Sequence, residues 1–298
     1  MKLDAFITSL AIEDAGEYAR VCERSGYHGL WLTETQVDPL LPLAVAATAT
    51  TKLRLGTGVA IALARSPMVM AMDAWALQRA SRGRLDLGLG TQVKAHVERR
   101  FSMPYSDPAK RIKEYVAALR HIWGAFQGEH RLDFKGDFYR FDLLTPFFDP
   151  GPIADPKIAV FLAAVNDGMF RAAGEVADGI EAHPFSTPSY LRDVALPAVA
   201  KGLARSGRAR DARLGFGMQN GDKAIYGEAV VDMIRGVDHK LATKIAKQYA
   251  AKYGRGFKYR PKPEQYEKGH VFRARPQKLI AFDVKKFETS AARFTFTA

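Results

Sequence analysis

Cysteine is almost absent from this 298-residue chain, which contains only Cys22. A single thiol excludes an internal disulfide framework and a thiolate metal cluster, and it is typical of a reducing cytoplasm. The sequence also lacks the His-Glu-x-x-His zinc motif, the Gly-x-Ser-x-Gly turn of serine hydrolases and the nucleotide-binding phosphate loop. A protein with neither a strong nucleophile nor a metal site usually takes its reactivity from an organic cofactor. We therefore expect a cytoplasmic protein that uses one, with Cys22 as a buried residue of the first helix.

Long hydrophobic runs are also missing. The most apolar region, residues 56–77, is interrupted by Arg65 and Asp73, so we predict no membrane span. Asp4 interrupts the short apolar start of the chain, which predicts a first strand rather than a signal peptide.

Acidic residues are scarce in the last quarter of the chain. Residues 219–298 contain 17 of the 44 Lys and Arg residues but only 8 of the 32 Asp and Glu residues, so they carry +9 of the total net charge of +12. This change in composition predicts two modules, at residues 1–210 and 211–298.

Strands and helices alternate through the first module. The predicted strands are 3–8, 29–33, 53–61, 84–89, 157–163 and 179–182, and the predicted helices are 13–25, 40–50, 68–80, 107–126, 168–176 and 188–205. Such alternation predicts parallel strands joined by crossover helices. Six units in 210 residues approach the density of a (β/α)₈ barrel, which takes about 250 residues.

We therefore predict an α/β fold with a TIM-type barrel that is incomplete at about six units. A doubly wound open sheet is the alternative, but it would carry a glycine-rich dinucleotide turn after the first strand, where residues 8–10 contain no glycine. The second module shows strand patterns at 214–218, 224–233, 270–275, 278–284 and 293–297 around a basic helix at 238–253. This order predicts a small antiparallel β-rich segment.

The carboxyl ends of barrel strands hold the active site, and the opposite ends serve stability. This rule places His28, which precedes its strand, on the stability face. Gly88 and Gly90 leave the backbone open at the end of the fourth strand, where a flat cofactor or a phosphate can approach. Polar residues that follow the strands are Glu34, Thr35, Arg65, Thr91, Gln92, His96, Asn166, Asp167, His183 and Ser186.

Each candidate also has a structural interpretation. Glu34 fits a solvated loop carboxylate or an ion pair with Arg65, and Thr91 and Gln92 fit caps of the next helix. His96 fits the charged face of a helix better than a catalytic site. Asn166 fits a helix N-cap, although the same geometry binds anions. The turn around His183 fits contact with a phosphate or a ring.

Eight segments occur in an order that resembles the bacterial luciferase-like superfamily of flavin- and deazaflavin-dependent oxidoreductases, closest to its deazaflavin branch. They are GLWLTE (29–34), LRLGTGVAI (53–61), ARSPMVMA (64–71), SRGRLDLGLGT (81–91), KRIKEYVAALRHIW (110–123), GDFYRF (136–141), PKIAVFLAA (156–164) and AGEVADGIEAHP (173–184).

The resemblance implies a TIM-type barrel with the deazaflavin coenzyme F420 at its mouth, or FMN as the alternative. It implies a non-prolyl cis peptide behind the ring, around Gly58, Val59 and Ala60. The reaction implied is hydride transfer to or from a small organic substrate, with Glu34 and His183 as the candidate catalytic acid or base. The implied cofactor-binding residues are Gly58, Val59, Ala60, Thr91, Gln92, Ala164, Val165, Asn166 and Ser186, the last four near the phosphate.

The C-terminal segment at 273–296 instead resembles the final strands of a pyridoxamine-phosphate-oxidase-like split barrel. Two alternatives therefore stay open: an FMN-dependent luciferase-like monooxygenase, and an inactive fused or truncated barrel with a basic nucleic-acid-binding tail. The tail would be residues 252–276, where aromatic and basic residues alternate, although a solvated surface explains them better. We expect a small-molecule substrate and disfavour nucleic acid, and a homodimer remains open.

Overall fold

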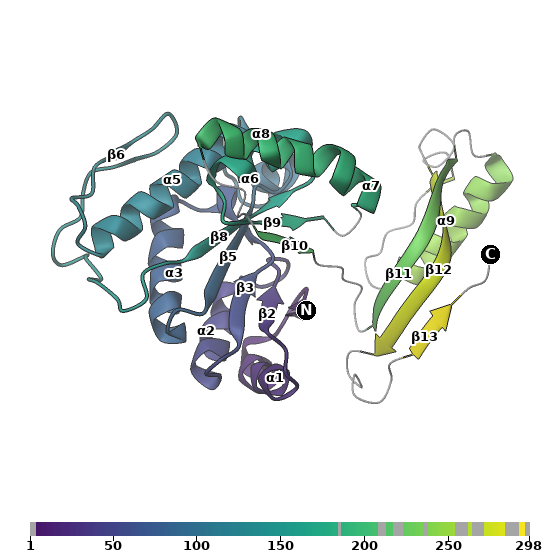
Figure 1. Ribbon diagram of the computed structural model, residues 1–298, viewed down its shortest axis with the longest axis horizontal. Coiled ribbons are helices and arrows are strands. Elements are labelled where there is room, and N and C mark those ends of the chain that lie inside the picture. Colours follow the sequence, from purple (N-terminus) through teal and green to yellow (C-terminus); the bar gives the residue numbers. More distant parts are fainter. Residues whose placement is uncertain are drawn as a thin grey trace. The chain divides into compact units, whose positions relative to one another are not determined.

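A computed structural model of the chain describes residues 4–183, 186–207, 213–216, 223–234, 238–253, 262–263, 271–283 and 292–295. The chain forms two compact units, Met1–Gly221 and Asp222–Ala298 (Figure 1). The assignment of separate functional domains to residues 1–210 and 211–298 remains a prediction. Within the described residues, no helix combines the length and the apolarity needed to cross a membrane.

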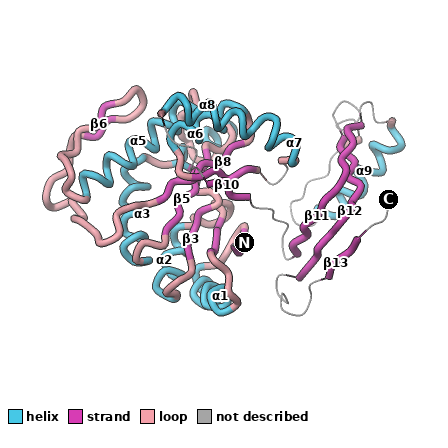
Figure 2. The backbone as a smooth tube through the Cα atoms, in the orientation of Figure 1, coloured by secondary structure: helices cyan, strands magenta, loops and turns pink. Residues whose placement is uncertain are grey.

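The first unit is built on one curled sheet, in which every strand pairing is parallel. Its strands follow the order β1-β2-β3-β5-β8-β9-β10, and β4 pairs with β5. Figure 2 shows the strands in the middle of the unit with helices on the outside. They are β1 (Asp4–Ile7), β2 (Gly29–Leu32), β3 (Arg54–Thr57), β4 (Ala60–Ile61), β5 (Leu85–Gly90), β8 (Ala159–Ala164), β9 (Gly179–Ala182) and β10 (Arg213–Phe216).

Helices cover the convex face of this sheet, as the predicted alternation requires. They are α1 (Ile12–Arg24), α2 (Leu40–Ala49), η1 (Ala62–Ala64), α3 (Pro67–Ser81), α4 (Lys94–Arg99), α5 (Pro108–Phe126), α6 (Asp167–Val176), α7 (Pro188–Tyr190), η2 (Leu191–Ala195) and α8 (Leu196–Ser206). Cys22 is buried on α1, as predicted. The incomplete TIM-type barrel is confirmed, because the described sheet ends at β1 on one edge and at β10 on the other.

Two predicted strand assignments were wrong. Residues 214–218 were expected in the antiparallel segment, but β10 pairs in parallel with β9 and so adds a seventh strand position to the barrel sheet. The strand expected over 53–61 is divided into β3 and β4. A strand pattern shows that a segment is extended, but its pairing partner depends on contacts distant in sequence.

The convex face of the sheet is apolar and buried under the helices, as the leucines of β5 show. Leu85, Leu87 and Leu89 are fully buried in the core that the helices share, whereas the alternate residues face the concave side. Helix α5 packs on this core through apolar residues that recur at helical spacing and are buried, namely Ile112, Val116, Leu119, Ile122 and Trp123. The helix predicted over 107–126 begins one residue later, after Asp107, whose side chain makes no capping hydrogen bond there.

The concave face is built from glycines that each make room for one neighbouring side chain. A Cβ atom added at any of them would lie 1.9 to 2.6 Å from an atom of that side chain, far inside van der Waals contact. Trp31 and Phe161 also meet edge to face there, with ring centroids 5.4 Å apart. The pairs are Gly56 with Trp31, Gly58 with Phe6, Gly88 with Glu181, Gly90 with Val59, and Gly179 with Phe161.

The N-terminal strand ends are held by two charged side chains. Arg84 donates five hydrogen bonds of 2.6 to 2.9 Å to oxygens of Ala47, Thr50, Leu53 and Ser81, and so satisfies carbonyls at the end of α2. Glu23 accepts the backbone N–H groups of residues 51, 52 and 53 through one carboxylate oxygen.

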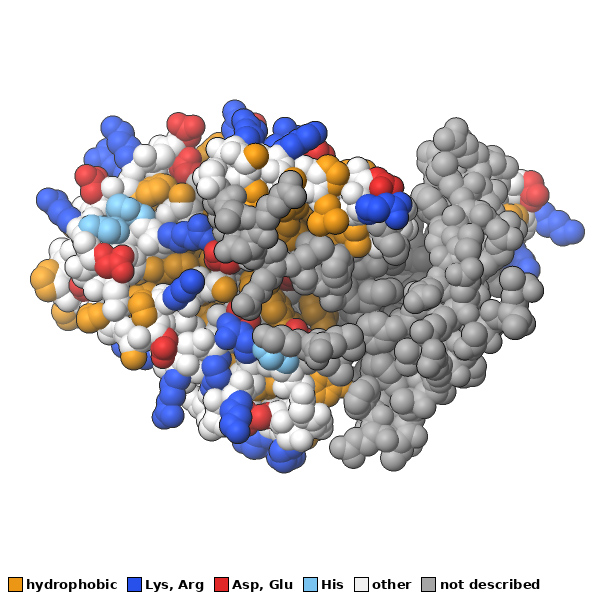
Figure 3. All heavy atoms as spheres, in the orientation of Figure 1, with side chains coloured by type: hydrophobic (Ala, Val, Ile, Leu, Met, Phe, Trp, Pro, Cys, Tyr) orange, Lys and Arg blue, Asp and Glu red, His pale blue; other side chains and the backbone are white. Residues whose placement is uncertain are grey.

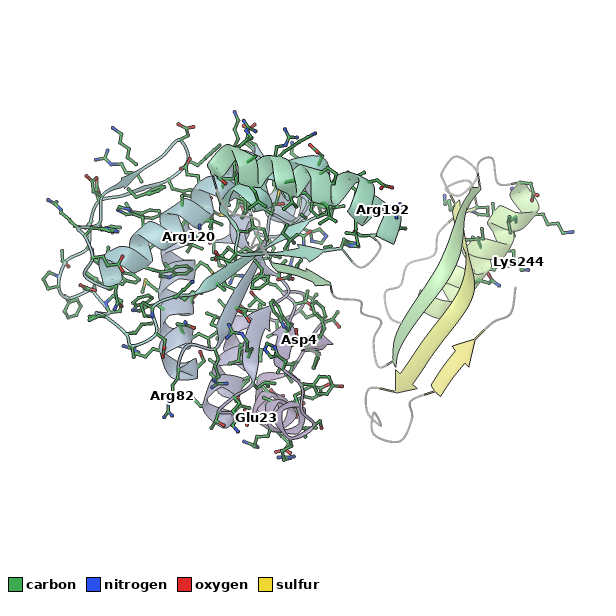
Figure 4. The ribbon with its side chains drawn as sticks, viewed as in Figure 1. Asp4, Glu23, Arg82, Arg120, Arg192 and Lys244 are labelled. Carbon is green, nitrogen blue, oxygen red and sulfur yellow. The ribbon has the colours of Figure 1, made fainter. Side chains whose placement is uncertain are left out.

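Figure 4 shows Glu23 and Arg82 near the ends of α1 and α3, and Asp4 at the start of β1. His28 contacts Asp4, with 3.2 Å between its Nδ1 and the carboxylate Oδ1. These contacts agree with the prediction that this face serves stability. In Figure 3, basic side chains are spread around the margin of the first unit together with acidic ones.

A two-stranded excursion between α5 and β8 is held by one carboxylate. Its strands are β6 (Phe134–Lys135) and β7 (Arg140–Phe141), within the region 130–141 that shows strand-like alternation. Glu114 of α5 accepts three backbone N–H groups from the turn, at residues 137, 138 and 139.

The described residues of the second unit form a three-stranded antiparallel sheet and one helix. The strands are β11 (Lys223–Ile234), β12 (Val271–Asp283) and β13 (Ala292–Thr295), and the helix is α9 (His239–Tyr253). Two strands predicted at 270–275 and 278–284 form the single strand β12. Its pairing with β11 shifts register between Glu228 and Ala229, and Pro276, which has no N–H to donate, pairs with Ala229 at this irregularity.

We predict that Gly88→Ala destabilises the first unit by about 1–3 kcal/mol, because the new methyl group meets the Thr57 carbonyl oxygen and the Glu181 carboxylate, both 1.9 Å away. Urea denaturation measures the change. Gly168→Ala is the matched control, since its nearest contact of 3.5 Å leaves room for a methyl group. Equal stability of both variants would contradict the packing of the concave face.

We predict that Arg84→Met lowers the free energy of unfolding by about 2–4 kcal/mol, because several buried carbonyl groups lose their donors. Arg79→Met, at an exposed position of α3, should change it by less than about 0.5 kcal/mol. Thermal and urea unfolding of the two variants test this difference.

Candidate functional site

The carboxyl ends of neighbouring parallel strands form one continuous rim, and most of the predicted site residues lie on it. The strands β2, β3, β5, β8 and β9 are consecutive in the sheet. Because parallel strands end at the same edge, the segments after them share that edge. These segments contain Glu34, Gly58 to Ala60, Thr91 and Gln92, Val165 and Asn166, and His183 with Ser186.

The segment after β3 departs from regular strand geometry. The peptide bond between Gly58 and Val59 is cis, in the region where the resemblance implied it. Gly58 donates its N–H to the carbonyl of Leu32 at 2.8 Å, and Glu34 donates its N–H to the carbonyl of Val59 at 3.1 Å. The end of β2 is therefore joined to this segment on both sides of the cis bond.

Glu34 forms an ion pair at the centre of this junction. Its Oε1 accepts a hydrogen bond from Arg65 Nη2 at 2.5 Å, and its Oε2 accepts the N–H of Ile61 at 2.7 Å. Arg65 also donates to Asp38 at 2.8 Å. The ion pair between Glu34 and Arg65, one of the interpretations that the sequence allowed, is thus present. The alternative of a solvated loop carboxylate was wrong, since Glu34 is only 8% exposed.

Two opposing effects act on the Glu34 carboxyl group. Burial raises its pKa, while the Ile61 N–H and the Arg65 guanidinium favour the charged form. Repulsion from Asp38 adds to the effect of burial, and the net result is a pKa above the ordinary value for glutamate. Glu34 is consequently a buried acid whose charged form is favoured by Arg65 and, to a smaller extent, by Arg100.

Thr91 and Gln92 follow β5, but they do not cap the next helix. Helix α4 begins at Lys94 without a side-chain capping bond. Gln92 has a positive φ of 57°, its side-chain oxygen accepts the N–H of Val93, and its carbonyl accepts the Tyr105 hydroxyl. His96 is exposed on α4, which agrees with the helix-face interpretation.

Asn166 is an N-cap residue at the start of α6. Its side-chain oxygen accepts the N–H of Met169 at 3.1 Å, which leaves helix-start N–H groups directed toward the rim. Tyr190 donates its hydroxyl to the carbonyl of Val165 at 2.7 Å. The Val165 side chain is 58% exposed, so the rim presents an apolar surface beside the N-terminus of α6.

His183 follows β9 and is exposed, and its carbonyl accepts the N–H of Ser186 at 2.8 Å. Pro184 and Phe185 lie outside the described residues. Three strand positions separate Glu34 from His183 along the sheet, so the two candidate catalytic residues lie at different parts of the rim. Most of the basic run at 252–276 also lies outside the described residues.

The sequence reasoning missed Glu181, which belongs to the middle of β9. The chain places its carboxyl group on the concave face, where Oε1 is inaccessible to solvent and has no hydrogen-bond partner among the described residues. Burial, and then repulsion from Asp86, raise its pKa well above the ordinary value. An acidic residue between Ile180 and Ala182, both buried, was the available signal. Across the described residues, no group of three His, Cys, Asp or Glu side chains could hold a metal ion.

Comparison with known proteins shows which family the chain belongs to. The family described as luciferase-like monooxygenase matches residues 4–267. The chain belongs to this family. The match extends beyond residue 210, the predicted end of the first module, and the resemblance of the C-terminal segment to a split barrel remains a prediction.

Curated relatives of this luciferase-like chain include an uncharacterised protein of Mycobacterium tuberculosis, which is 49% identical over 212 residues. These residues are 71% of this chain and 62% of that relative, so the chain spans less than two thirds of its length. An F420-dependent glucose-6-phosphate dehydrogenase of Nakamurella multipartita is 32% identical over 147 residues, 49% of this chain and 41% of that enzyme.

Solved structures share the fold of this luciferase-like chain at low sequence identity. The F420-dependent tetrahydromethanopterin reductase of Methanopyrus kandleri has a TM-score of 0.60 at 21% identity, over 72% of this chain and 65% of its own. A riboflavin lyase solved with modified FMN has a TM-score of 0.63 at 14% identity, over 84% of this chain and 66% of the lyase chain.

We predict that Arg65→Met destabilises the protein by about 3–5 kcal/mol near neutral pH, because Glu34 then stays buried without its cation. The loss should shrink in acid, because the pKa of Glu34 is raised and its carboxyl group takes up a proton there and no longer requires a cation. Urea denaturation as a function of pH measures this dependence.

The double variant Glu34→Gln with Arg65→Met should recover part of the lost stability, since it removes both charges of the pair. Arg99→Met, at an exposed position of α4, is the matched control. A loss for Arg65→Met that does not depend on pH would show that the ion pair is not its cause.

Proposed function

We propose that this chain is a deazaflavin-dependent oxidoreductase that transfers hydride between a small organic substrate and coenzyme F420 held at the rim. The observation that carries the proposal is the buried Glu34–Arg65 pair, which joins the end of β2 to the segment after β4 at the catalytic end of the barrel. An ion pair on the stability face would have no such implication.

The rim has the surface chemistry that a flat ring with a phosphate-bearing chain requires. Val93 and Val165 are 57% and 58% exposed at two of its strand ends, and they offer apolar contact to a ring. The start of α6 offers N–H groups and the positive end of a helix dipole to an anion. These features support ring contact at Gly58, Val59, Ala60, Thr91 and Gln92, and phosphate contact at Ala164, Val165, Asn166 and Ser186.

A bound deazaflavin supplies a two-electron hydride acceptor or donor. The protein's own contribution is to orient the substrate, exclude water and move a proton. Both oxygens of Glu34 already accept hydrogen bonds, so it would hold the rim segments in place and set the local charge. His183 is exposed, which supports it as the residue that exchanges a proton with substrate.

The names of the relatives favour F420 over FMN. The glucose-6-phosphate dehydrogenase that is 32% identical to this chain is F420-dependent, whereas the FMN-containing riboflavin lyase is 14% identical and shares only the fold. An FMN-dependent monooxygenase is the second candidate, supported by the family description.

The proposal predicts that the purified full chain binds oxidised F420 and quenches its fluorescence, with weaker binding of FMN. Val165→Asp should weaken F420 binding on the order of tenfold, because it places a negative charge beside the ring and the phosphate. Val21→Asp, at an exposed position of α1, is the matched control and should bind as the natural chain does.

Tighter binding of FMN than of F420 would favour the monooxygenase. If folded protein bound neither cofactor, the inactive fused barrel would be the better interpretation. Equal loss of affinity in the Val165 and Val21 variants would place the ring away from the rim.

A further inference from the structure

Among the described residues, Glu181 has no cation beside it, unlike the carboxylates Asp86 and Glu34. Asp86 binds Arg54 through two hydrogen bonds of 2.5 Å, which engage Nε and Nη2 of the guanidinium. Glu34 has Arg65. Within the described residues, the only charged group that acts on Glu181 is Asp86, which repels a negative charge there.

The surroundings of Glu181 on each packed strand are uncharged or acidic. Phe6 of β1 and Phe161 of β8 occupy the same face, and Gly88 and Gly58 lie against its carboxyl group. On β10 its register partner is Gly215, which has no side chain. An ionised carboxylate at this position would place Oε1, which is inaccessible to solvent, near Asp86 without a compensating charge.

A polar group close to Glu181 Oε1 is a second hydrogen-bond acceptor, the carbonyl oxygen of Thr57. The Thr57 carbonyl oxygen and Glu181 Oε1 each lie 1.9 Å from the position that a Cβ of Gly88 would occupy. The two oxygens can therefore be no farther apart than twice that distance. Two acceptors at such a separation repel each other unless a proton lies between them. Protonation of Glu181 supplies that donor.

This contact lies at the base of the proposed ring site. Thr57 is the last residue of β3, directly before the cis bond, and Glu181 Oε2 lies 3.2 Å from the Cβ position of Gly58. The Thr57 hydroxyl is already used, since it donates to the Gly88 carbonyl at 2.6 Å. The Thr57 carbonyl is thus the group through which a hydrogen bond from Glu181 of β9 can fix the end of β3.

We propose that Glu181 is a positioning residue of the ring site: a carboxylic acid kept neutral inside the barrel, whose hydroxyl donates to the Thr57 carbonyl and holds the segment from Gly58 to Ala60. The role of Glu181 at a ring site rests on the proposed function. Its protonation and its hydrogen bond to Thr57 do not. Glu181→Gln retains a donor of the same shape without a titrating group, and Glu181→Leu removes the donor.

The first test needs no cofactor. An infrared difference spectrum between the natural full chain and Glu181→Gln, near neutral pH, should contain the C=O band of a protonated carboxylic acid. A carboxylate band in its place would overturn the proposal. Glu17→Gln, at an exposed position of α1, is the matched control and should show a carboxylate band, because Arg24 and Arg20 lower the pKa of Glu17.

The second test follows the unfolding equilibrium with pH. A raised pKa in the folded state means that the folded chain keeps a proton which the unfolded chain loses, so stability falls as pH rises above the unfolded pKa of about 4.3. Relative to Glu181→Gln, the unfolding constant of the natural chain should rise up to tenfold per pH unit until the folded pKa is reached. Identical pH profiles for the two proteins would overturn the proposal.

The third test separates this inference from the proposed function. Glu181→Gln should bind F420 as the natural chain does, whereas Glu181→Leu should bind on the order of tenfold more weakly, because the Thr57 carbonyl loses its donor. Equal binding by both variants would overturn the positioning role. If the natural chain bound no F420 but showed the carboxylic acid band, the proposed function would fail while the neutral state of Glu181 stood.

Discussion

Close approach of side chains to glycine backbone on the concave face is the constraint on which the rest of the first unit depends. Trp31, Phe161, Phe6, Val59 and Glu181 each occupy the space that a Cβ of a facing glycine would need. This interdigitation fills the interior of a curled sheet with few side chains. It also brings β9 against the ends of β3 and β5, where the rim begins.

The distribution of cations then decides the character of each buried carboxyl group. Asp86 has Arg54 near the N-terminal strand ends, and Glu34 has Arg65 at the rim. Glu181, between these two levels, has no cation in the described part of the barrel. The described part of the barrel thus contains two charge-compensated carboxylates and a third carboxyl group for which the neutral form is favoured.

Much of the fold could be predicted from local patterns. The alternating strand and helix patterns predicted a strand at 84–89 and a helix at 107–126, and β5 and α5 are present there, because such patterns depend only on which face of one element is buried. The pairing of β10 with β9 and the merging of two segments into β12 were not predictable in this way, because they depend on residues distant in sequence. At the site, strand ends predicted where Glu34, Thr91, Asn166 and His183 lie, but not that Glu34 uses both oxygens within the protein.

The sequence by itself determined the α/β class, the rim of strand ends and the chain's resemblance to the luciferase-like family, because spacing and short motifs encode them locally. Only the tertiary structure decided which carboxyl groups have a cation and which do not. Glu34 and Arg65 are 31 positions apart, and Glu181 meets Thr57 and Gly88 from another strand. The charge state of a buried acid depends on such neighbours, since desolvation and the nearest charge are set in space rather than along the chain.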